Sequence, residues 1–346
     1  MIAQAAGVSV MTVSRALRNL GKVSDRRRLQ VRKIAEQLGY RPDPTVAKLM
    51  YHLRRRQKPA FQGLVCALTT VPLTTRWDFS DEVVAGARAQ ADALGYAFSL
   101  LHVDRSPEGY RSLRRVLRSR GAEGVMLLPL LDLENVNDWL EWDHYSVVTT
   151  SGSILAPKVH RIAPSQFANT LLLCRQLAER GYRRIGLVID QAHDERVGHN
   201  FTAAVEWHGR HEAFHYLAPF IFDGQKPDPR KLKHWFRRER PDVLLASQDR
   251  ITIGYVDSLG IKIPGPVGLA RTSTTAMTLY SGMDELPAAI GATAVGQLTG
   301  LIQRGEKGVP NLPAITLLPG RWVEGTTCPR RTARAPGSGV AAPLPR

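Results

Sequence analysis

Beyond residue 60, short apolar runs alternate with longer segments in which apolar residues recur every three or four positions. The short runs have the length and composition of buried strands. We predict strands at 63–69, 96–103, 124–128, 145–149, 184–189, 214–222 and 242–246. We predict helices at 81–94, 110–120, 167–180, 231–238 and 288–304. Strands that alternate with helices in this way indicate parallel sheets covered by helices on both faces, and the elements are too many for one compact sheet, so we expect two α/β lobes.

The amino-terminal segment has a different pattern, that of two short helices joined by a sharp turn. Gly7 suits the turn, because glycine adopts a positive φ without strain. Ser9 can cap the helix that follows through its hydroxyl group. At 100° per residue, one face of that helix carries the small and apolar side chains of Val13, Ala16 and Leu17, which can pack on the first helix. The pattern predicts a helix-turn-helix.

The opposite side of the second helix carries Met11, Ser14 and Arg15. Arg15 stands out, because its guanidinium group can donate to O6 and N7 of guanine together in the DNA major groove. A purely structural helical hairpin is the plainer alternative. Charge favours DNA: residues 1–58 hold 14 Lys or Arg against three acidic residues, and this excess supplies most of the net charge of +16. Such a local excess is typical of polyanion binding.

Two further helices are expected in the basic segment. One covers 25–38, and we expect its buried positions to include Leu29, Ile34 and Leu38. The other is a short helix at about 44–50, with Asp43 as its N-cap and a proline at its first position. A linker would then join the basic segment to the α/β lobes.

Composition limits the remaining possibilities. The three cysteines are far apart in the sequence, so we expect neither a disulfide framework nor a four-ligand zinc cluster. We see no secretory signal peptide and no apolar run of membrane-spanning length. A cytoplasmic protein without membrane contact is expected. The tail at 329–346 is rich in Pro, Arg, Ala and Gly, and we expect it to be disordered.

Several motifs resemble a known family in the expected order. Ala6-Gly7-Val8-Ser9-x-x-Thr12-Val13-Ser14-Arg15-Ala16-Leu17, followed by Gly39-Tyr40-x-Pro42, resembles the headpiece of the LacI/GalR family of bacterial transcription regulators. The resemblance continues in Leu177-x-x-x-Gly181-Tyr182-Arg183-Arg184-Ile185-Gly186, in Arg240-Pro241-Asp242-Val243 and in Gly291-x-x-Ala294.

This resemblance implies a fold and a function. The fold would be an all-α helix-turn-helix headpiece at 1–58, followed at 59–328 by an α/β two-lobed effector domain similar to periplasmic binding proteins. The protein would be a sequence-specific transcriptional regulator, and we expect a repressor. A homodimer would bind double-stranded operator DNA, one headpiece per half-site. A small-molecule effector, expected to be a sugar, would change the affinity for the operator.

The resemblance also assigns roles to single residues of the headpiece. Val10, Met11 and Arg15 match base-reading positions. The two apolar residues would contact thymine methyl groups or sense groove shape, whereas Arg15 would donate hydrogen bonds. Thr12 and Ser14 match positions that contact phosphate groups.

Further roles fall outside the helix-turn-helix. Leu49 matches the hinge leucine that wedges into a central base step of the minor groove, although a plain packing role is the alternative. Arg196 and Asp249 match the pair that binds polar groups of the effector, and surface ion pairing is the alternative for both. The pocket segment departs from the family pattern. Residues 268–272 stand where members commonly end a strand in Gly-Phe-Asp, and Pro164 stands where an Asp is common.

Two other classes of function remain open. His211-Glu212-x-x-His215 matches the zinc metallohydrolase signature, which on a helix places two imidazoles one turn apart. Only Glu239 or His234 suggests itself as a third ligand. The other class is a solute-binding protein without DNA contact, against which the basic headpiece argues. No glycine-rich phosphate loop or nucleophile elbow is present, and we expect neither an enzyme nor a bound cofactor or metal.

Overall fold

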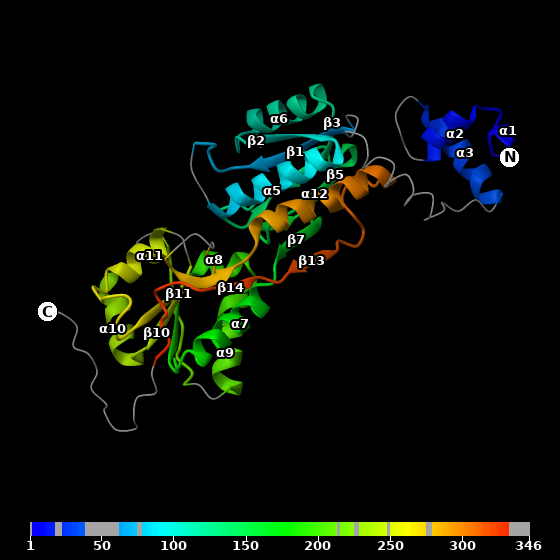
Figure 1. Cartoon of the computed structure of the whole chain (residues 1–346). Helices are drawn as coiled ribbons and strands as arrows, with labels where there is room; N and C mark the ends of the chain where they lie inside the picture. Colours follow the sequence, from blue (N-terminus) through cyan, green and yellow to red (C-terminus); the bar gives the residue numbers. More distant parts are fainter. Residues whose placement is uncertain are drawn as a thin grey trace.

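The computed structural model describes residues 2–17, 23–38, 62–74, 78–212, 215–224, 228–247, 250–274 and 279–331. They form a small helical headpiece and two α/β lobes (Figure 1). The predicted hinge helix at 44–50, with Leu49, lies outside these residues, and so does the part of the predicted tail beyond residue 331. No helix in the described ranges combines the length and apolar content that a membrane span requires.

The headpiece consists of α1 (Ile2–Ala5), α2 (Val10–Leu17) and α3 (Asp25–Gln37). Its small core is formed by the buried side chains of Ala6, Val13, Ala16 and Val31. The inward face predicted for α2 is therefore confirmed, with Leu17 packed at the edge of this core.

The buried positions predicted for α3 are wrong in two of three cases. Leu29 is 69% exposed and Leu38 is 48% exposed, whereas Val31 and Ala35 are buried. Leu29 lies two positions before Val31, and at 100° per residue this turns it by about 200° to the solvent side of the helix. Leu38 lies beyond the last helical residue, at the C-cap. Ile34 packs against the core as predicted.

The first lobe contains a parallel sheet with the strand order β13-β7-β5-β3-β1-β2. Its strands are β1 (Gly63–Thr69), β2 (Tyr96–His102), β3 (Ala122–Leu127), β5 (Ser146–Thr149), β7 (His160–Pro164) and β13 (Ile315–Leu318). Three helices flank the sheet: α5 (Asp78–Leu94), α6 (Pro107–Ser119) and α12 (Pro287–Arg304). One apolar core joins the sheet to α5 and α12, and a second lies on the face covered by α6. A short pair, β4 (Glu134–Asn135) and β6 (Ile154–Ala156), and the 3-10 turn η1 (Trp142–His144) complete this lobe.

The second lobe has the strand order β14-β12-β11-β10-β8-β9. Its strands are β8 (Ile185–Asp190), β9 (Phe220–Phe222), β10 (Val243–Ala246), β11 (Gly268–Arg271), β12 (Ser281–Asp284) and the antiparallel β14 (Arg321–Val323). Its helices are α7 (Gln166–Glu179), α8 (Gln191–Arg196), α9 (Asn200–His211), α10 (Pro229–Glu239) and α11 (Arg250–Asp257). The core on one face of the sheet includes residues of α7 and α9, and the core on the other includes residues of α10 and α11.

Within the described residues, the chain passes between the lobes three times, from β7 to α7, from β12 to α12 and from β13 to β14. In all three passages it leaves a sheet at the carboxyl end of a parallel strand. The carboxyl edges of both sheets therefore face the boundary between the lobes, which is where open α/β sheets place their ligands.

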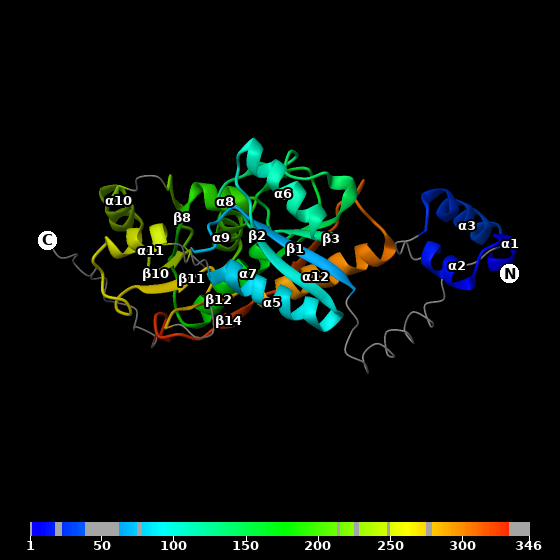
Figure 2. The ribbon, with the colours of Figure 1, turned by 90° about the horizontal axis from the view of Figure 1, so that it is seen from above.

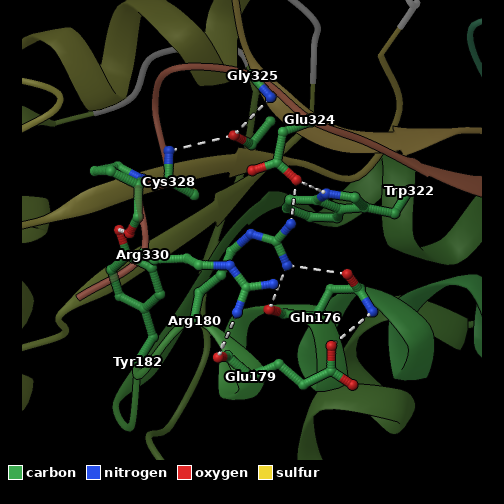
Figure 3. A network of polar contacts seen from close by, with 11 residues as sticks. Gln176, Glu179, Arg180, Tyr182, Trp322, Glu324, Gly325, Cys328 and Arg330 are labelled. Atoms are coloured by element: carbon green, nitrogen blue, oxygen red, sulfur yellow. Dashed lines mark hydrogen bonds and ion pairs between the residues drawn. The ribbon is translucent and has the colours of Figure 1, made fainter. Parts of the chain in front are cut away.

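The final described segment is fastened to the second lobe around Arg180 (Figure 3). The Arg180 side chain is 3% exposed and forms an ion pair with Glu324. Its Nη1 donates to the main-chain and side-chain oxygens of Gln176, each at 2.9 Å. The guanidinium also stacks on the Trp322 ring, 4.4 Å from the ring centroid. The charge of this buried cation is thus compensated by an acid, two neutral acceptors and an aromatic face.

The predicted alternation of strands and helices agrees with the structure for the long elements and is wrong at 214–222. In the described part of this range, residues 215–222, the strand is limited to β9, Phe220–Phe222, which pairs with β8. Pro219 precedes it and has no N–H to donate to a neighbouring strand, so pairing begins only after the proline.

Helices α5 and α12 lie side by side in both views (Figures 1 and 2), and they approach each other closely at two glycines. A Cβ on Gly291 would lie 1.9 Å from the carbonyl oxygen of Val83, and a Cβ on Gly86 would lie 1.9 Å from that of Ala288. Such distances are far below van der Waals contact, so the helices can pack in this way only without side chains at these positions.

We therefore expect Gly291→Ala to lower the free energy of unfolding by about 3 kcal/mol, the upper range for overpacking a core. Gly296→Ala in the same helix is the matched control, because nothing lies within 4 Å of the Cβ it would add. The control should raise stability by about 0.5–1 kcal/mol through helix propensity. Urea unfolding of both variants measures the difference, and equal stabilities would contradict the proposed close approach.

Candidate functional site

The turn between α1 and α2 is held as the sequence predicts. Gly7 has a φ of +62°, the left-handed conformation that glycine tolerates best. The N–H of Val8 donates to the Ala3 carbonyl at 3.0 Å and closes the turn. The Ser9 hydroxyl accepts a hydrogen bond from the N–H of Thr12 at 3.1 Å and so caps α2. A helix-turn-helix is therefore present.

The two sides of α2 differ as a recognition helix requires. Val13 and Ala16 face the headpiece core, whereas Arg15 is exposed. Thr12 is half-buried, and its hydroxyl lies 2.9 Å from that of Ser9. Val10, Met11 and Ser14 belong to the same helix, but the structure describes only their backbone. The base-reading and phosphate roles of these residues stay predictions.

Helix α3 adds cations beside α2. Arg26, Arg27, Arg32 and Lys33 are all exposed on it. Arg28 is different, because its guanidinium is held by the Asp25 carboxylate at 2.7 Å and by the Val23 carbonyl at 3.2 Å. Four exposed positive charges on one short helix produce the potential that attracts a phosphate backbone.

Of the predicted effector-binding pair, the structure describes only Arg196. This residue ends α8 in the second lobe, and its Nη1 donates to the carbonyl of Leu131, which follows β3 in the first lobe. Arg196 thus lies at the boundary between the lobes. Asp249 and the predicted minor-groove residue Leu49 lie outside the described residues, so the pairing of Arg196 with Asp249 remains a prediction.

The zinc-hydrolase alternative requires a helix through residues 211–215, and the structure contradicts that requirement. Helix α9 ends at His211, and Glu212 has an extended backbone. The two imidazoles of the motif are therefore not separated by one helical turn. The Glu212 carboxylate instead faces Arg175 at 3.3 Å and the buried His208 at 3.8 Å. Among the described residues, no three His, Cys, Asp or Glu side chains could hold a metal ion together.

A groove of about 460 Å³ lies between β9 and α10, at the edge of the second lobe. Its lining combines aromatic, apolar and basic side chains: Pro219, Phe220, Ile221, Arg230, Lys231, His234, Trp235 and Arg238. It includes none of the residues predicted to bind DNA or the effector, and His234 is the one candidate zinc ligand in it. Arg230 and Arg238 each have an acidic neighbour, Asp228 and Glu239.

The passage from β12 to α12 contains a buried acid, Glu285, which sequence reasoning did not single out. The residue is 6% exposed. Burial raises the pKa of Glu285 to about 7, and the charge of Asp284 adds to the increase, whereas a hydrogen bond from the Ser273 side chain opposes it. Asp284 is itself held by Arg321, whose Nη2 lies 3.0 Å from its Oδ2. Glu285 is thus divided between its charged and neutral forms near neutral pH.

The headpiece matches a known protein family. Residues 2–43 match the model of the family described as bacterial regulatory proteins, lacI family. Catabolite control protein B of Bacillus subtilis is 25% identical over 264 residues, which cover 73% of this chain and 78% of that protein. The maltose regulon regulatory protein MalI of Escherichia coli is 27% identical over 205 residues, 57% of this chain and 56% of MalI. The chain matches only 34% of the B. subtilis regulator DegA, at 27% identity.

Solved structures resemble the whole arrangement. The lac repressor dimer bound to operator and the anti-inducer ONPF has a TM-score of 0.56 at 18% identity, covering 95% of this chain and 98% of that one. The complex of the regulator CelR with cellobiose has a TM-score of 0.57 at 18% identity, covering 94% of this chain and 98% of that one. The predicted fold class, a helix-turn-helix headpiece with a two-lobed α/β domain, is confirmed.

The buried acid at the lobe passage predicts a specific pH dependence. Folded Glu285 keeps its proton up to about pH 7, whereas the unfolded residue releases it near 4.5. The contribution of Glu285 to stability therefore falls as pH rises from about 4.5 to about 7, by about 3 kcal/mol in total. Glu285→Gln has no such loss. Its free energy of unfolding should therefore rise relative to that of wild type between about pH 4.5 and 7, and the difference should stay constant above pH 8. Urea unfolding measures the difference, and parallel curves for the two proteins would refute the assignment.

Proposed function

Because residues 2–43 of this chain belong to the LacI family of bacterial regulatory proteins, we propose that the chain is a DNA-binding transcriptional regulator. It reads a specific operator by inserting α2 into the major groove. Arg15 carries this proposal, because it is exposed on a helix whose start is fixed by the Gly7 turn and the Ser9 cap. Val10 and Met11 complete the base-reading set, and Thr12 and Ser14 contact phosphate groups.

The chain acts as a homodimer and as a repressor, with one headpiece on each half of a near-palindromic site. In support, the lac repressor, which shares the fold, was solved as a dimer on its operator. Leu49 inserts into the minor groove between the half-sites and kinks the DNA. Its DNA partner would place the protein in the cytoplasm.

A small-molecule effector of sugar type, bound between the lobes, controls operator affinity. The fold supports this role, because three chain passages join the lobes and Arg196 of one lobe already contacts the other. The related fold of CelR was solved with cellobiose. An effector that prefers one arrangement of the lobes shifts the protein towards it and thereby changes how the headpieces meet DNA. Arg196 and Asp249 hold polar groups of the effector. The function requires no catalysis.

Substitution of Arg15 tests the base-reading role. We expect Arg15→Ala to weaken binding of the selected operator by about 1–3 kcal/mol and to relax the preference at one base position in each half-site. Lys33→Ala, at an exposed position of α3, is the matched control. It should weaken binding to specific and to non-specific DNA by a similar factor and lower the salt dependence of both affinities. Fluorescence anisotropy on both kinds of DNA at several salt concentrations measures the effects. Unchanged affinity and base preference in Arg15→Ala would show that α2 does not read bases.

The minor-groove role of Leu49 has an independent test. Leu49→Ala should reduce DNA bending together with operator affinity, because the kink is produced by a side chain that separates two base pairs. Leu49→Met keeps an apolar side chain of similar length and should retain most of the bend. A gel-phasing assay reports the bend angle. Wild-type bending by Leu49→Ala would assign the residue to packing alone.

A further inference from the structure

The two lobes touch at Gly152, in the loop that follows β5. A Cβ at this position would lie 2.3 Å from the Arg196 carbonyl oxygen and 3.2 Å from Nη1 of Arg161. Arg161 belongs to β7 of the first lobe, and Arg196 ends α8 of the second. The guanidinium of Arg161 and the main-chain carbonyl of Arg196 therefore border the same glycine at the lobe boundary.

The charge of Arg161 is not compensated by the described residues. Its side chain is half-buried, and burial alone lowers the pKa of the guanidinium. No carboxylate within the described ranges forms an ion pair with it, and its buried Nε has no hydrogen-bond acceptor there. Arg180 differs only at its terminal nitrogens: its Nε also has no acceptor among the described residues, but its Nη2 pairs with Glu324 and its Nη1 donates to two oxygens of Gln176. A desolvated cation without a counter-charge is unfavourable, and it becomes favourable when an anion binds.

The acids at the facing edge of the second lobe are already engaged or partly protonated. At the end of β12, Asp284 is paired with Arg321, and burial raises the pKa of Glu285 to about 7. Arg271 ends β11, in the segment where the family resemblance leads one to expect an acidic residue. It is half-buried against the Tyr280 ring, 3.3 Å from the ring centroid, and burial lowers its pKa. Asp190 and Asp194 lie near this edge in sequence but are engaged within their own lobe. Asp190 accepts from the His193 N–H at 3.2 Å, and Asp194 accepts from the Thr202 hydroxyl at 2.7 Å.

We propose that the effector of this chain is a small anion whose carboxylate or phosphate oxygens are bound by Arg161. The proposal rests on the proposed function, since it names the class of effector that acts at the lobe boundary. A guanidinium binds such an oxyanion through two parallel charge-assisted hydrogen bonds, which a neutral sugar hydroxyl cannot match. Arg196 approaches the same boundary from the other lobe. An anion bound at this boundary can stabilise one arrangement of the lobes over another, which is what an effector does.

The test uses the full chain and three probes at constant ionic strength: inorganic phosphate, D-gluconate and neutral D-glucose. We expect at least one anion to raise the unfolding temperature in a saturable manner, and glucose to have a smaller effect. A response to phosphate alone would identify a phosphate ester, and a response to gluconate alone a sugar acid. If neither anion stabilises the protein more than glucose does, the proposal is overturned.

Variants of Arg161 assign the effect to the residue. Arg161→Gln should raise the apparent dissociation constant of the responding anion at least ten-fold, as expected when a charged hydrogen-bonding partner is removed. Arg161→Lys keeps the charge without the fork and should show an intermediate loss. Arg115→Gln, at an exposed position of α6, is the matched control and should bind as wild type does. Wild-type anion affinity in Arg161→Gln would overturn the proposal, because the anion would then bind elsewhere.

The same variant gives a second readout without ligand. Because Arg161→Gln removes a half-buried charge that no described carboxylate compensates, the ligand-free variant should unfold at a temperature about 2–4 °C above wild type. A lower unfolding temperature would mean that Arg161 is already stabilised by the fold, which contradicts the proposal.

Anion binding and DNA binding are measured separately, so the two proposals can fail independently. A chain that selects an operator but shows no Arg161-dependent anion effect retains its proposed function and loses only this inference. A chain that binds an anion through Arg161 but selects no operator retains the anion site and loses the proposed DNA-binding function.

Discussion

The arrangement of the two lobes depends on one constraint: parallel strands end at the same edge of their sheet. Both sheets turn that edge to the lobe boundary, because the chain leaves β7, β12 and β13 there to enter the other lobe. Loops that follow different strands are thereby brought together, among them the Gly152 loop, the Leu131 loop and the start of α8. A ligand bound between these loops would contact both lobes, so its binding energy would act on their relative arrangement.

Arg180 and Arg161 are both shielded from solvent, but only the charge of Arg180 is compensated by neighbouring groups. Arg180 fastens the carboxyl-terminal segment and has an acid, two further acceptors and an aromatic ring around it (Figure 3). Such a site is balanced in charge and stabilises the fold. Arg161 also loses solvent, but no carboxylate among the described residues pairs with it. Natural proteins retain an incomplete polar site of this kind where function needs it, and the boundary between two lobes is such a place.

The sequence predicts the long elements well and the short ones poorly. Strand β1 matches its prediction at both ends, and α5, α7 and α12 lie within a few residues of theirs, because their apolar periodicity extends over several turns. Strands β11 and β12 are not predicted, since four residues that include Gly, Ser or charged side chains carry little strand signal. Helix α9 is not predicted either, because its buried stripe contains an alanine and His208 beside its larger apolar residues. The headpiece turn is predictable, since Gly7 and Ser9 act on their immediate neighbours. The lack of a counter-charge at Arg161 is not predictable, because the groups around its guanidinium come from residues distant in sequence.

The central claim is that the headpiece recognises a specific DNA sequence, and a selection from random duplex oligonucleotides with the full-length chain tests it most directly. At near-physiological salt, the account predicts enrichment of one near-palindromic site with two equivalent half-sites, bound about 10³-fold or more tightly than unrelated DNA. Recovery of no common sequence after repeated rounds, with only salt-sensitive binding to all duplexes, would contradict it.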